Sequence, residues 1–311
     1  MTEFSIGVDL GGTNLRAAAI DSKGNVLEQI SAETNPENGR EYVISKIVQS
    51  IEDLRDRHKE ARLAGVGIGV PGFILIEKGV VVGSNNLAFL EDFPLRDEIE
   101  KRLETPVILE NDANAAALGE KWMGTGKDVN DLVLLTLGTG IGGGIIHKGR
   151  VMHGFVGMAG ELGHITVVPN GNPCGCGNVG CLEKHASATA VSCMASLMRV
   201  THDPEPTTKQ IYELALAGDE KARQVFASMG DALGIAIATL INIFNFPLYL
   251  LSGGPLPAWE FFAPAMFAQV EKRSFTYRHT KTRIEKAALG GLAGLYGAAY
   301  LPFQAQKDRL G

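Results

Sequence analysis

The sequence predicts an α/β protein in which strands alternate with helices and pair largely in parallel. Runs rich in β-branched and aliphatic residues, such as "GVGIGV" at 65–70 and "DLVLLTL" at 131–137, are typical of buried strands. Segments with apolar residues at helical spacing lie between such runs, and glycine clusters follow three of the strands. This alternation predicts a parallel sheet covered by helices.

In the first half, an apolar strand over Phe4–Val8 ends at Asp9 and a Gly-Gly pair. Two further strands, joined by the turn sequence "DSKGN", complete the opening of this half. The later elements are a helix whose apolar pattern lies within 40–62, a strand with its loop at 63–72, a strand at 106–112 and a helix at 113–124.

The second half repeats this order. We expect a strand at 131–137, a glycine loop at 138–144, a strand at 145–151, mainly helix over 208–245, a strand at 247–254 and helices at 258–274 and 289–301. Because each half begins with strands around glycines, we predict two α/β domains around a central cleft. The smaller domain covers 1–111 and is completed by the C-terminal helix 295–311, and the larger covers 112–294.

The composition narrows the classes of function. The chain has 311 residues, of which 45% are hydrophobic and 21% charged, and its formal net charge is −6. An acidic balance argues against a general nucleic-acid or membrane-surface binder. The N-terminal residues carry no basic region followed by an apolar run, and no apolar stretch is long enough to span a bilayer. We therefore expect a cytoplasmic protein without nucleic-acid or membrane partners.

The three glycine clusters are "DLGGTN" at 9–14, "LGTGIGGG" at 137–144 and "LSGGP" at 251–255. The middle cluster matches G-x-G-x-x-G, but a strand follows it where a dinucleotide-binding motif requires a helix. A single cluster is most simply a tight turn, whereas three that end core strands favour binding of nucleotide phosphates. The candidate nucleotide-binding residues, with Asp9 holding Mg²⁺ through water, are Asp9, Gly11, Gly12, Thr13, Gly138, Thr139, Gly140, Gly253 and Gly254.

The stretch "ENDANAAALGE" places Asn111 and Asp112 where a strand ends and a helix begins. The positive end of the helix dipole favours an ionised carboxylate at such a position. An ionised Asp beside a hydroxyl can accept its proton during phosphoryl transfer. The alternative is that Asp112 only caps the helix, and these residues alone leave the two interpretations even.

Together with "GVGIGVPG", "AGELGH" and "CGCGNVGCLE", these motifs resemble the ROK family (repressors, open reading frames and kinases) from residue 4 to about 300. Within it, the chain is most similar to bacterial ATP-dependent glucokinases. The resemblance implies an actin-like ATPase fold of the ribonuclease H-like type, phosphorylation of glucose at the 6-hydroxyl by ATP and Mg²⁺, and Asp112 as the general base. It implies sugar contacts from Gly72, Asn86, Asn111, Asp112, Glu161, His164 and Glu183. Asn14 departs from the family, in which many members have Lys.

Three of the four cysteines, Cys174, Cys176 and Cys181, lie within eight positions. A disulfide would leave one of these thiols over in a reducing compartment, whereas a closed structural zinc site uses three thiolates and one histidine. Spacing alone does not separate His164 from His185 as the fourth ligand, and the family pattern implies His164. We expect structural zinc to fix Glu161, His164 and Glu183 against one another as a sugar-binding wall.

Other functions within and beyond this family remain alternatives. N-acetylmannosamine kinase and fructokinase are other hexose kinases of the family, and polyphosphate is an alternative phosphoryl donor. A sugar-responsive transcriptional regulator of the family would carry a helix-turn-helix segment before the first strand, and this chain has three residues before Phe4. A bare actin-like ATPase would need neither the cysteines nor the sugar-facing acids. The resemblance also implies a homodimer or a tetramer.

Overall fold

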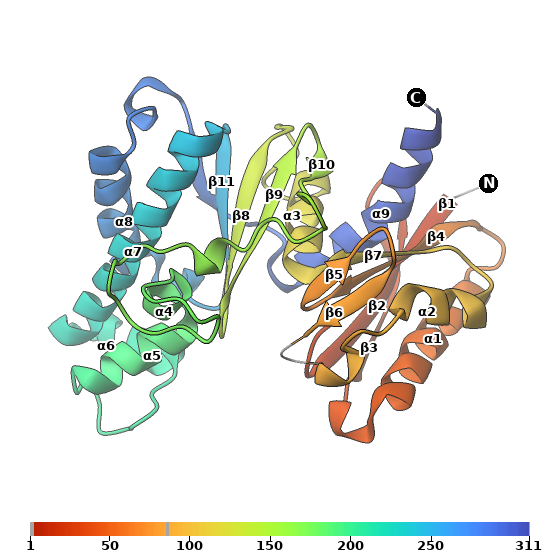
Figure 1. The fold of residues 1–311 in the computed structure, drawn as a ribbon, viewed down its shortest axis with the longest axis horizontal. Helices are drawn as coiled ribbons and strands as arrows, with labels where there is room; N and C mark the ends of the chain where they lie inside the picture. Colours follow the sequence, from red (N-terminus) through yellow and green to blue (C-terminus); the bar gives the residue numbers. More distant parts are fainter. Residues whose placement is uncertain (1–2, 85–86, 311) are drawn as a thin grey trace. The chain divides into compact units, whose positions relative to one another are not determined.

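The computed structural model describes residues 3–84 and 87–310 (Figure 1). The chain divides into two compact units. Unit 1 comprises Met1–Asn130, Gly144–Gly160 and Ala288–Gly311, and unit 2 comprises Asp131–Gly143 and Glu161–Ala287. This grouping places residues 112–130 in unit 1, whereas the sequence-based division begins the second domain at Asp112. The division into folding domains stays a prediction.

Unit 1 is built on a five-stranded sheet with the order β3-β2-β1-β4-β7. Strands β1, β2 and β3 are antiparallel neighbours, and β4 and β7 extend the sheet in parallel with β1. A hairpin of β5 and β6 lies outside this sheet. The strands are β1 (Glu3–Leu10), β2 (Asn14–Asp21), β3 (Val26–Glu33), β4 (Arg62–Val70), β5 (Phe73–Leu75), β6 (Val80–Gly83) and β7 (Val107–Asn111).

Four α-helices belong to the described part of unit 1, namely α1 (Arg40–Arg57), α2 (Leu95–Leu103), α3 (Asp112–Trp122) and α9 (Ala293–Leu310). Because successive residues of a strand face opposite sides, β2 contributes to two cores. One face packs in the cluster that holds the apolar side of α1, and the other packs against α9. A Cβ on Gly67 would collide with the backbone of Ala298, so glycine in β4 lets α9 lie directly on the sheet.

The second sheet has the order β10-β9-β8-β11-β12, and the boundary between the units falls within β9. In unit 2, β8 pairs in parallel with β11, and β11 pairs in parallel with β12. In unit 1, β10 forms an antiparallel hairpin with the end of β9. These strands are β8 (Leu132–Leu137), β9 (Ile141–His147), β10 (Arg150–Val151), β11 (Leu248–Gly253) and β12 (Arg283–Lys286).

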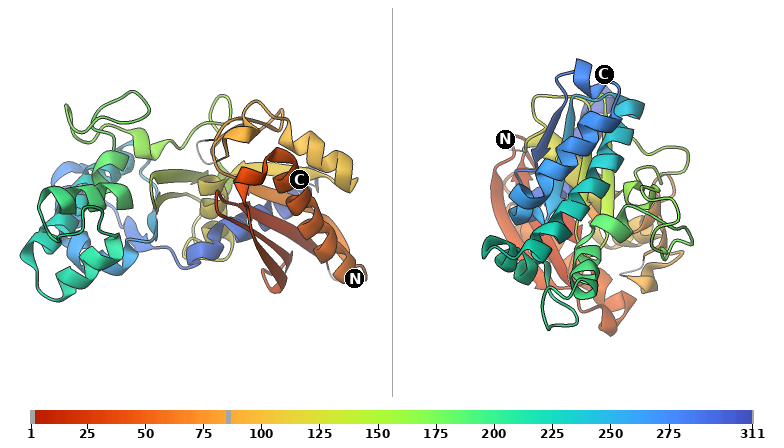
Figure 2. Two further views of the ribbon diagram at one scale, coloured as in Figure 1. Left: turned by 90° about the horizontal axis from the view of Figure 1, so that it is seen from below. Right: turned by 90° about the vertical axis from the view of Figure 1, so that its left-hand side faces the viewer.

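The helices of unit 2 are α4 (Glu183–Ala186), α5 (Ala188–Leu197), α6 (Thr208–Leu216), α7 (Glu220–Phe244) and α8 (Trp259–Arg273). Helices α7 and α8 run side by side (Figures 1 and 2), because Gly230 and Gly234 of α7 leave room for the backbone of α8. Among the described helices, only α7 is long and apolar enough to cross a membrane. However, 61% of its most apolar 18-residue window is buried within the protein, as in a core helix.

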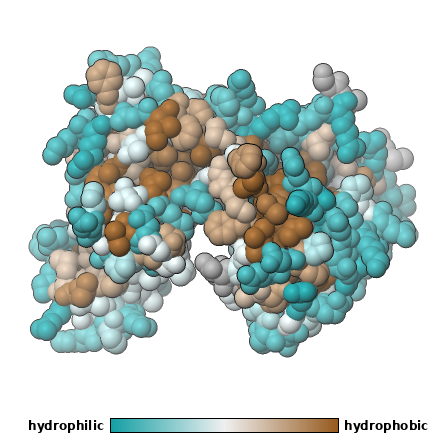
Figure 3. Space-filling view, viewed as in Figure 1, coloured by the Kyte–Doolittle hydropathy of each residue, from teal (hydrophilic) through white to brown (hydrophobic). Residues whose placement is uncertain are grey.

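Short 3-10 helices connect several of these elements: η1 (Pro36–Asn38), η2 (Ala88–Leu90), η3 (Leu162–His164), η4 (Leu256–Ala258), η5 (Tyr277–His279) and η6 (Gly290–Leu292). On the face drawn in Figure 3, hydrophilic areas alternate with apolar ones on both units. Single exposed apolar side chains are normal in soluble folds. The most exposed large ones are Phe155 in unit 1 and Leu197, Ile243 and Phe275 in unit 2.

Candidate functional site

Asn111 and Asp112 form the junction between β7 and α3. The Asn111 side-chain oxygen accepts hydrogen bonds from the backbone N–H groups of Ala113 and Asn114, at 2.9 and 3.2 Å. Asn111 is therefore the N-cap of α3, and Asp112 is its first helical residue. The Asp112 carboxylate also accepts a hydrogen bond of 2.9 Å from the N–H of Ala113, so both side chains contribute to the start of α3. The role of Asp112 as general base stays a prediction.

Gly72 lies beside this junction. Its carbonyl oxygen accepts a hydrogen bond of 3.1 Å from the side-chain amide of Asn111. Gly72 has a φ of 116°, and a Cβ at this position would collide with the carbonyl oxygen of Gly83, so only glycine fits. The structure thus brings Gly72 and Asn111, both expected to contact sugar, into direct contact. Asn86, a further residue with this expected role, lies outside the described residues.

The first glycine cluster forms a closed turn between β1 and β2. The backbone N–H of Gly11 donates to the carbonyl of Asn14 at 2.8 Å. Thr34, at the end of β3, fixes this turn from outside: its hydroxyl donates to the Gly11 carbonyl and its N–H to the Thr13 carbonyl. The turn is therefore held in one conformation before any ligand arrives.

Asp9 leads into this turn and pairs with Arg16, whose guanidinium donates to its carboxylate at 2.8 Å. Burial raises the pKa of Asp9 more than Arg16 lowers it. Arg16 also donates to the carbonyl of Gly291 at 2.6 Å, just before α9. A bound Mg²⁺ would favour the ionised form of a carboxylate in this position, which is consistent with the predicted role of Asp9.

The second and third glycine clusters are adjacent in unit 2. They follow β8 and β11, which are neighbouring parallel strands with Leu137 opposite Gly253. Gly253 has a φ of 113° and Gly254 donates its N–H to the Leu137 carbonyl at 3.1 Å. The carboxyl ends of neighbouring parallel strands are where α/β folds bind ligands. Two of the three predicted phosphate loops therefore lie side by side.

Glu183, the first residue of α4, contacts the glycine loop that follows β8. Its carboxylate accepts a hydrogen bond of 3.2 Å from the backbone N–H of Ile141. A Cβ on Gly140 would collide with the same carboxylate oxygen. The acid predicted to bind sugar is thus held by the loop predicted to bind phosphate.

Glu161 and His164 also lie close to Glu183 within unit 2. The Nε2 atom of His164 is 4.0 Å from the Glu161 carboxylate. Burial is the largest cause that raises the pKa of Glu161; His164 opposes this effect and the charge of Glu183 adds to it. The structure therefore places His164 beside Glu161, and the charge of Glu183 acts on the Glu161 carboxyl.

The cysteines and His164 form one cluster whose four ligand atoms lie within 4.8 Å of one another. The Cys174 sulfur is 3.6 Å from His164 Nδ1, and the Cys176 and Cys181 sulfurs are 3.7 Å apart. Burial and the neighbouring thiols raise the pKa of Cys181 to about 12. A cation would offset this effect, because metal binding stabilises the thiolate form.

These distances fit a tetrahedral zinc site. With Zn–S bonds of about 2.3 Å and Zn–N bonds of about 2.0–2.1 Å, the tetrahedron has edges of about 3.8 Å between sulfurs and about 3.6 Å between sulfur and nitrogen. His164 faces the thiols with Nδ1, and its Nε2 lies 4.0 Å from the Glu161 carboxylate, beyond hydrogen-bond distance. His185 is not part of the cluster, and its Nε2 is buried beside Gly171.

The sequence analysis missed two residues that contact the β7–α3 junction. Glu110 is 1% exposed, and its carboxylate lies 2.6 Å from Nε2 of His153. This hydrogen bond is the main cause that raises the pKa of His153, against the opposing effect of burial. Glu110 is an acidic residue inside the apolar strand "PVILEND", and this pattern indicates a buried carboxylate that needs a partner. His153, in a glycine-rich loop, gives no comparable signal.

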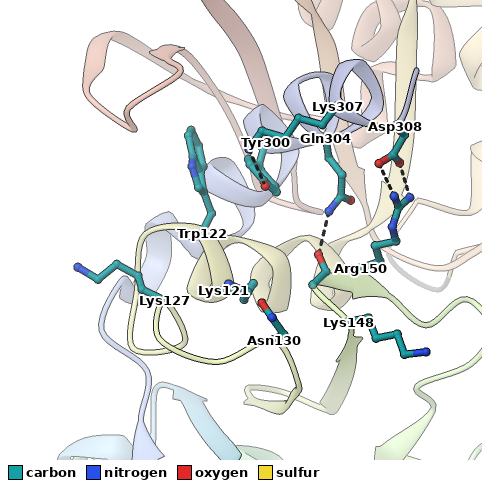
Figure 4. A pocket seen from close by; sticks show the side chains of 11 residues that line it. Lys121, Trp122, Lys127, Asn130, Lys148, Arg150, Tyr300, Gln304, Lys307 and Asp308 are labelled. Atoms are coloured by element: carbon teal, nitrogen blue, oxygen red, sulfur yellow. Dashed lines mark hydrogen bonds and ion pairs between the residues drawn. The ribbon is translucent and has the colours of Figure 1, made fainter. Parts of the chain in front are cut away.

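A cavity of about 310 Å³ in unit 1 contains none of the predicted site residues (Figure 4). Trp122 stacks on Tyr300 at one side, and Gln304 donates to the carbonyl of Gly149 at 2.8 Å. Arg150 and Asp308 form an ion pair at another side of the cavity. Lys127 and Lys148 point away from these pairs in Figure 4, so the lysines do not converge on one point.

Comparison with known proteins identifies similar chains along nearly the full length. A sequence profile of the ROK family matches residues 5–305. A glucokinase of Halalkalibacterium halodurans is 35% identical over 97% of this chain and 96% of its own length. A glucokinase of Thermotoga maritima is 41% identical over 82% of this chain and 83% of its own length.

A solved structure gives the same result in three dimensions. The ROK family glucokinase from Streptomyces griseus, crystallised with glucose and AMPPNP, superposes with a TM-score of 0.80. It is 32% identical, and the alignment covers 97% of this chain and 99% of that one.

Proposed function

The chain belongs to the ROK family and has its actin-like ATPase fold, and from this premise we propose that it is an ATP-dependent glucokinase. It transfers the γ-phosphoryl group of ATP to the 6-hydroxyl of glucose, with ADP as the leaving group. The observation that carries this proposal is the full-length similarity to glucokinases, together with a carboxylate at the start of α3. The same similarity supports a cytoplasmic enzyme, and the resemblance supports a homodimer or tetramer.

In this proposal Asp112 accepts the proton of the 6-hydroxyl as that oxygen bonds to phosphorus. Asn111, fixed by Gly72 and by the N–H groups of α3, donates to a sugar hydroxyl with its second amide hydrogen. Glu161 and Glu183 accept hydrogen bonds from further hydroxyls, and His164, whose Nδ1 faces the thiols, donates one from Nε2. Because a site built to bind hydroxyls rejects sugars that lack them, these groups give selectivity among hexoses.

The turns after β1, β8 and β11 hold the nucleotide through backbone N–H groups other than those of Gly11, Gly138 and Gly254, which donate to backbone carbonyl groups. Thr13 and Thr139 offer hydroxyls to phosphate oxygens. Asp9 would hold Mg²⁺ through water, and the ion would supply positive charge that offsets phosphate charge during transfer. The cluster of His164 and three cysteines holds structural zinc, which supplies rigidity to the wall that carries Glu161 and Glu183.

Initial rates across a panel of hexoses test the proposal. With ATP and Mg²⁺, kcat/KM for glucose is expected to exceed the values for N-acetylmannosamine and fructose by at least about tenfold. ATP hydrolysis without sugar is expected to be on the order of 100-fold slower than phosphorylation, because the reacting groups must exclude water. Equal rates of ATP consumption with and without glucose would show an uncoupled ATPase, and a higher value for another hexose would change the substrate.

Gly140→Ala tests whether Glu183 binds sugar from its place beside the phosphate loop. The new Cβ forces the Glu183 side chain to move, and this flexible side chain can do so without unfolding unit 2. We expect KM for glucose to rise about tenfold with a smaller change in KM for ATP. Gly138→Ala is a control for the KM of glucose alone: its Cβ would contact only a carbonyl at 3.9 Å and leaves Glu183 in place, but Gly138 belongs to the predicted phosphate loop, so the KM for ATP is not part of this control. An unchanged KM for glucose would place Glu183 outside the sugar site.

A further inference from the structure

Glu110 and His153 form a buried acid–base pair that the reaction proposed above does not use. Glu110 lies in β7 next to Asn111, and its side chain is 2% exposed. His153 follows β10 and is 37% exposed, so the pair lies at the edge of the core of unit 1. An ionised carboxylate in such surroundings is costly unless its oxygens are fully hydrogen-bonded.

Three donors from two segments satisfy the Glu110 carboxylate. One oxygen accepts from the backbone N–H of Asn111 at 2.9 Å and from the side-chain amide of Asn114 at 3.1 Å. The other oxygen lies 2.6 Å from Nε2 of His153. The first two donors lie on either side of Asp112 in the chain. The Glu110 carboxylate is therefore hydrogen-bonded to residues both before and after the predicted base.

His153 is in turn fixed by its own loop. Its carbonyl oxygen accepts a hydrogen bond of 3.1 Å from the N–H of Ala159, and the φ of 70° at Gly154 turns the chain back toward Ala159. Met152 donates to the carbonyl of Ile145, which ties the start of the loop to β9. The loop that carries His153 is therefore fixed by backbone hydrogen bonds at its start and across its turn.

We propose that Glu110 and His153 are positioning residues that fix the Asn111–Asn114 segment, and with it the Asp112 carboxylate, for proton abstraction. This inference rests on the proposed function. Neither residue touches substrate in this role: His153 aligns Glu110, and Glu110 aligns the backbone of Asn111 and the side chain of Asn114. Small displacements of a catalytic group reduce the rate strongly, because proton transfer requires hydrogen-bond distance.

A graded series at position 153 tests this proposal. His153→Gln keeps an N–H donor at the reach of Nε2, His153→Asn withdraws it by one bond, and His153→Leu removes it. We expect kcat to fall in this order, by about tenfold or more in the Leu variant, and to stay within about threefold of wild type in the Gln variant. KM for ATP is expected to change little, because the nucleotide loops are not part of the pair. The Gln and Asn variants keep the test valid if the Leu variant does not fold.

His58→Leu is the matched control. His58 also pairs with a glutamate in unit 1, with Nε2 3.3 Å from Glu28, but it lies away from the β7–α3 junction. Its loss is expected to leave kcat unchanged. If the position-153 variants lose kcat only in proportion to folded protein, or if Gln fails to rescue, the positioning role is wrong. A wild-type enzyme that does not phosphorylate glucose would instead overturn the proposed function itself and the role of the pair with it.

Discussion

The Asp112→Asn variant is expected to lose turnover by about 10²–10⁴-fold while it keeps its fold and its affinity for glucose. The amide has the shape of the carboxylate but cannot accept a proton from the 6-hydroxyl. Its side-chain oxygen can still accept the 2.9 Å hydrogen bond from the N–H of Ala113. The start of α3 is therefore retained, and the change isolates the chemistry from the structure.

Three measurements separate this outcome from damage to the fold. Isothermal calorimetry with glucose measures binding, steady-state kinetics measures kcat, and thermal unfolding measures stability. Asp219→Asn is the matched control, because Asp219 caps α7 by accepting from the N–H of Ala222 at 2.8 Å. Asparagine is an equally good N-cap, so this control keeps both stability and turnover. Near-normal turnover in Asp112→Asn would remove Asp112 from the reaction.

The residues around Asp112 show what the sequence can predict. The strand at 106–112 and the helix that follows could be read from an apolar run, a polar pair and an alanine-rich segment, and both are confirmed in β7 and α3. Local pattern determines these elements. Glu110 and His153 could not be paired in this way, since their contact joins segments that are distant in the chain and depends on how β7 lies beside the loop after β10.

The middle glycine cluster differs from its prediction. A loop was expected over 138–144, but β9 begins at Ile141 and includes the last three glycines. The reason is packing: a Cβ on Gly144 would collide with the side chain of Ala117 in α3. Glycine there allows a helix to approach a strand and does not make a turn. A sequence pattern does not distinguish these two uses of glycine.

Two other segments show the limits of periodicity. The apolar pattern within 40–62 continues to Leu54, and α1 ends at Arg57, before β4 begins at Arg62. Between 73 and 104 the sequence analysis assigned no elements, whereas the structure has the β5–β6 hairpin and α2. Strands of three or four residues are too short to show an alternating pattern.

The choice between His164 and His185 likewise depends on tertiary structure. His185 lies four residues after Cys181 and His164 ten residues before Cys174, yet only His164 joins the thiols. Backbone contacts explain this: Leu182 donates to the carbonyl of Ile165, and Val167 donates to that of Gly180, so the strand-like segment after His164 lies against the segment that carries Cys181.

Loss of one zinc ligand is the second change with a large expected effect. Cys176→Ser is expected to lower the zinc content from about one ion per chain to nearly none, because closed structural sites need all four ligands. Glucose affinity is expected to fall by about 10–100-fold, since His164, which is predicted to contact sugar, is itself a member of the metal cluster. Elemental analysis measures the metal and calorimetry measures the sugar.

Cys193→Ser is the matched control, because Cys193 is an exposed cysteine outside the cluster. This variant is expected to keep zinc and glucose affinity, which separates the effect of the metal from a general effect of removing a thiol.

Asp112 lies in unit 1 and the zinc cluster in unit 2. The two losses should therefore differ in kind: Asp112→Asn lowers kcat with glucose bound, whereas Cys176→Ser lowers glucose binding first. A zinc-free Cys176→Ser enzyme with wild-type glucose affinity would show that Glu161, His164 and Glu183 keep their positions without the metal.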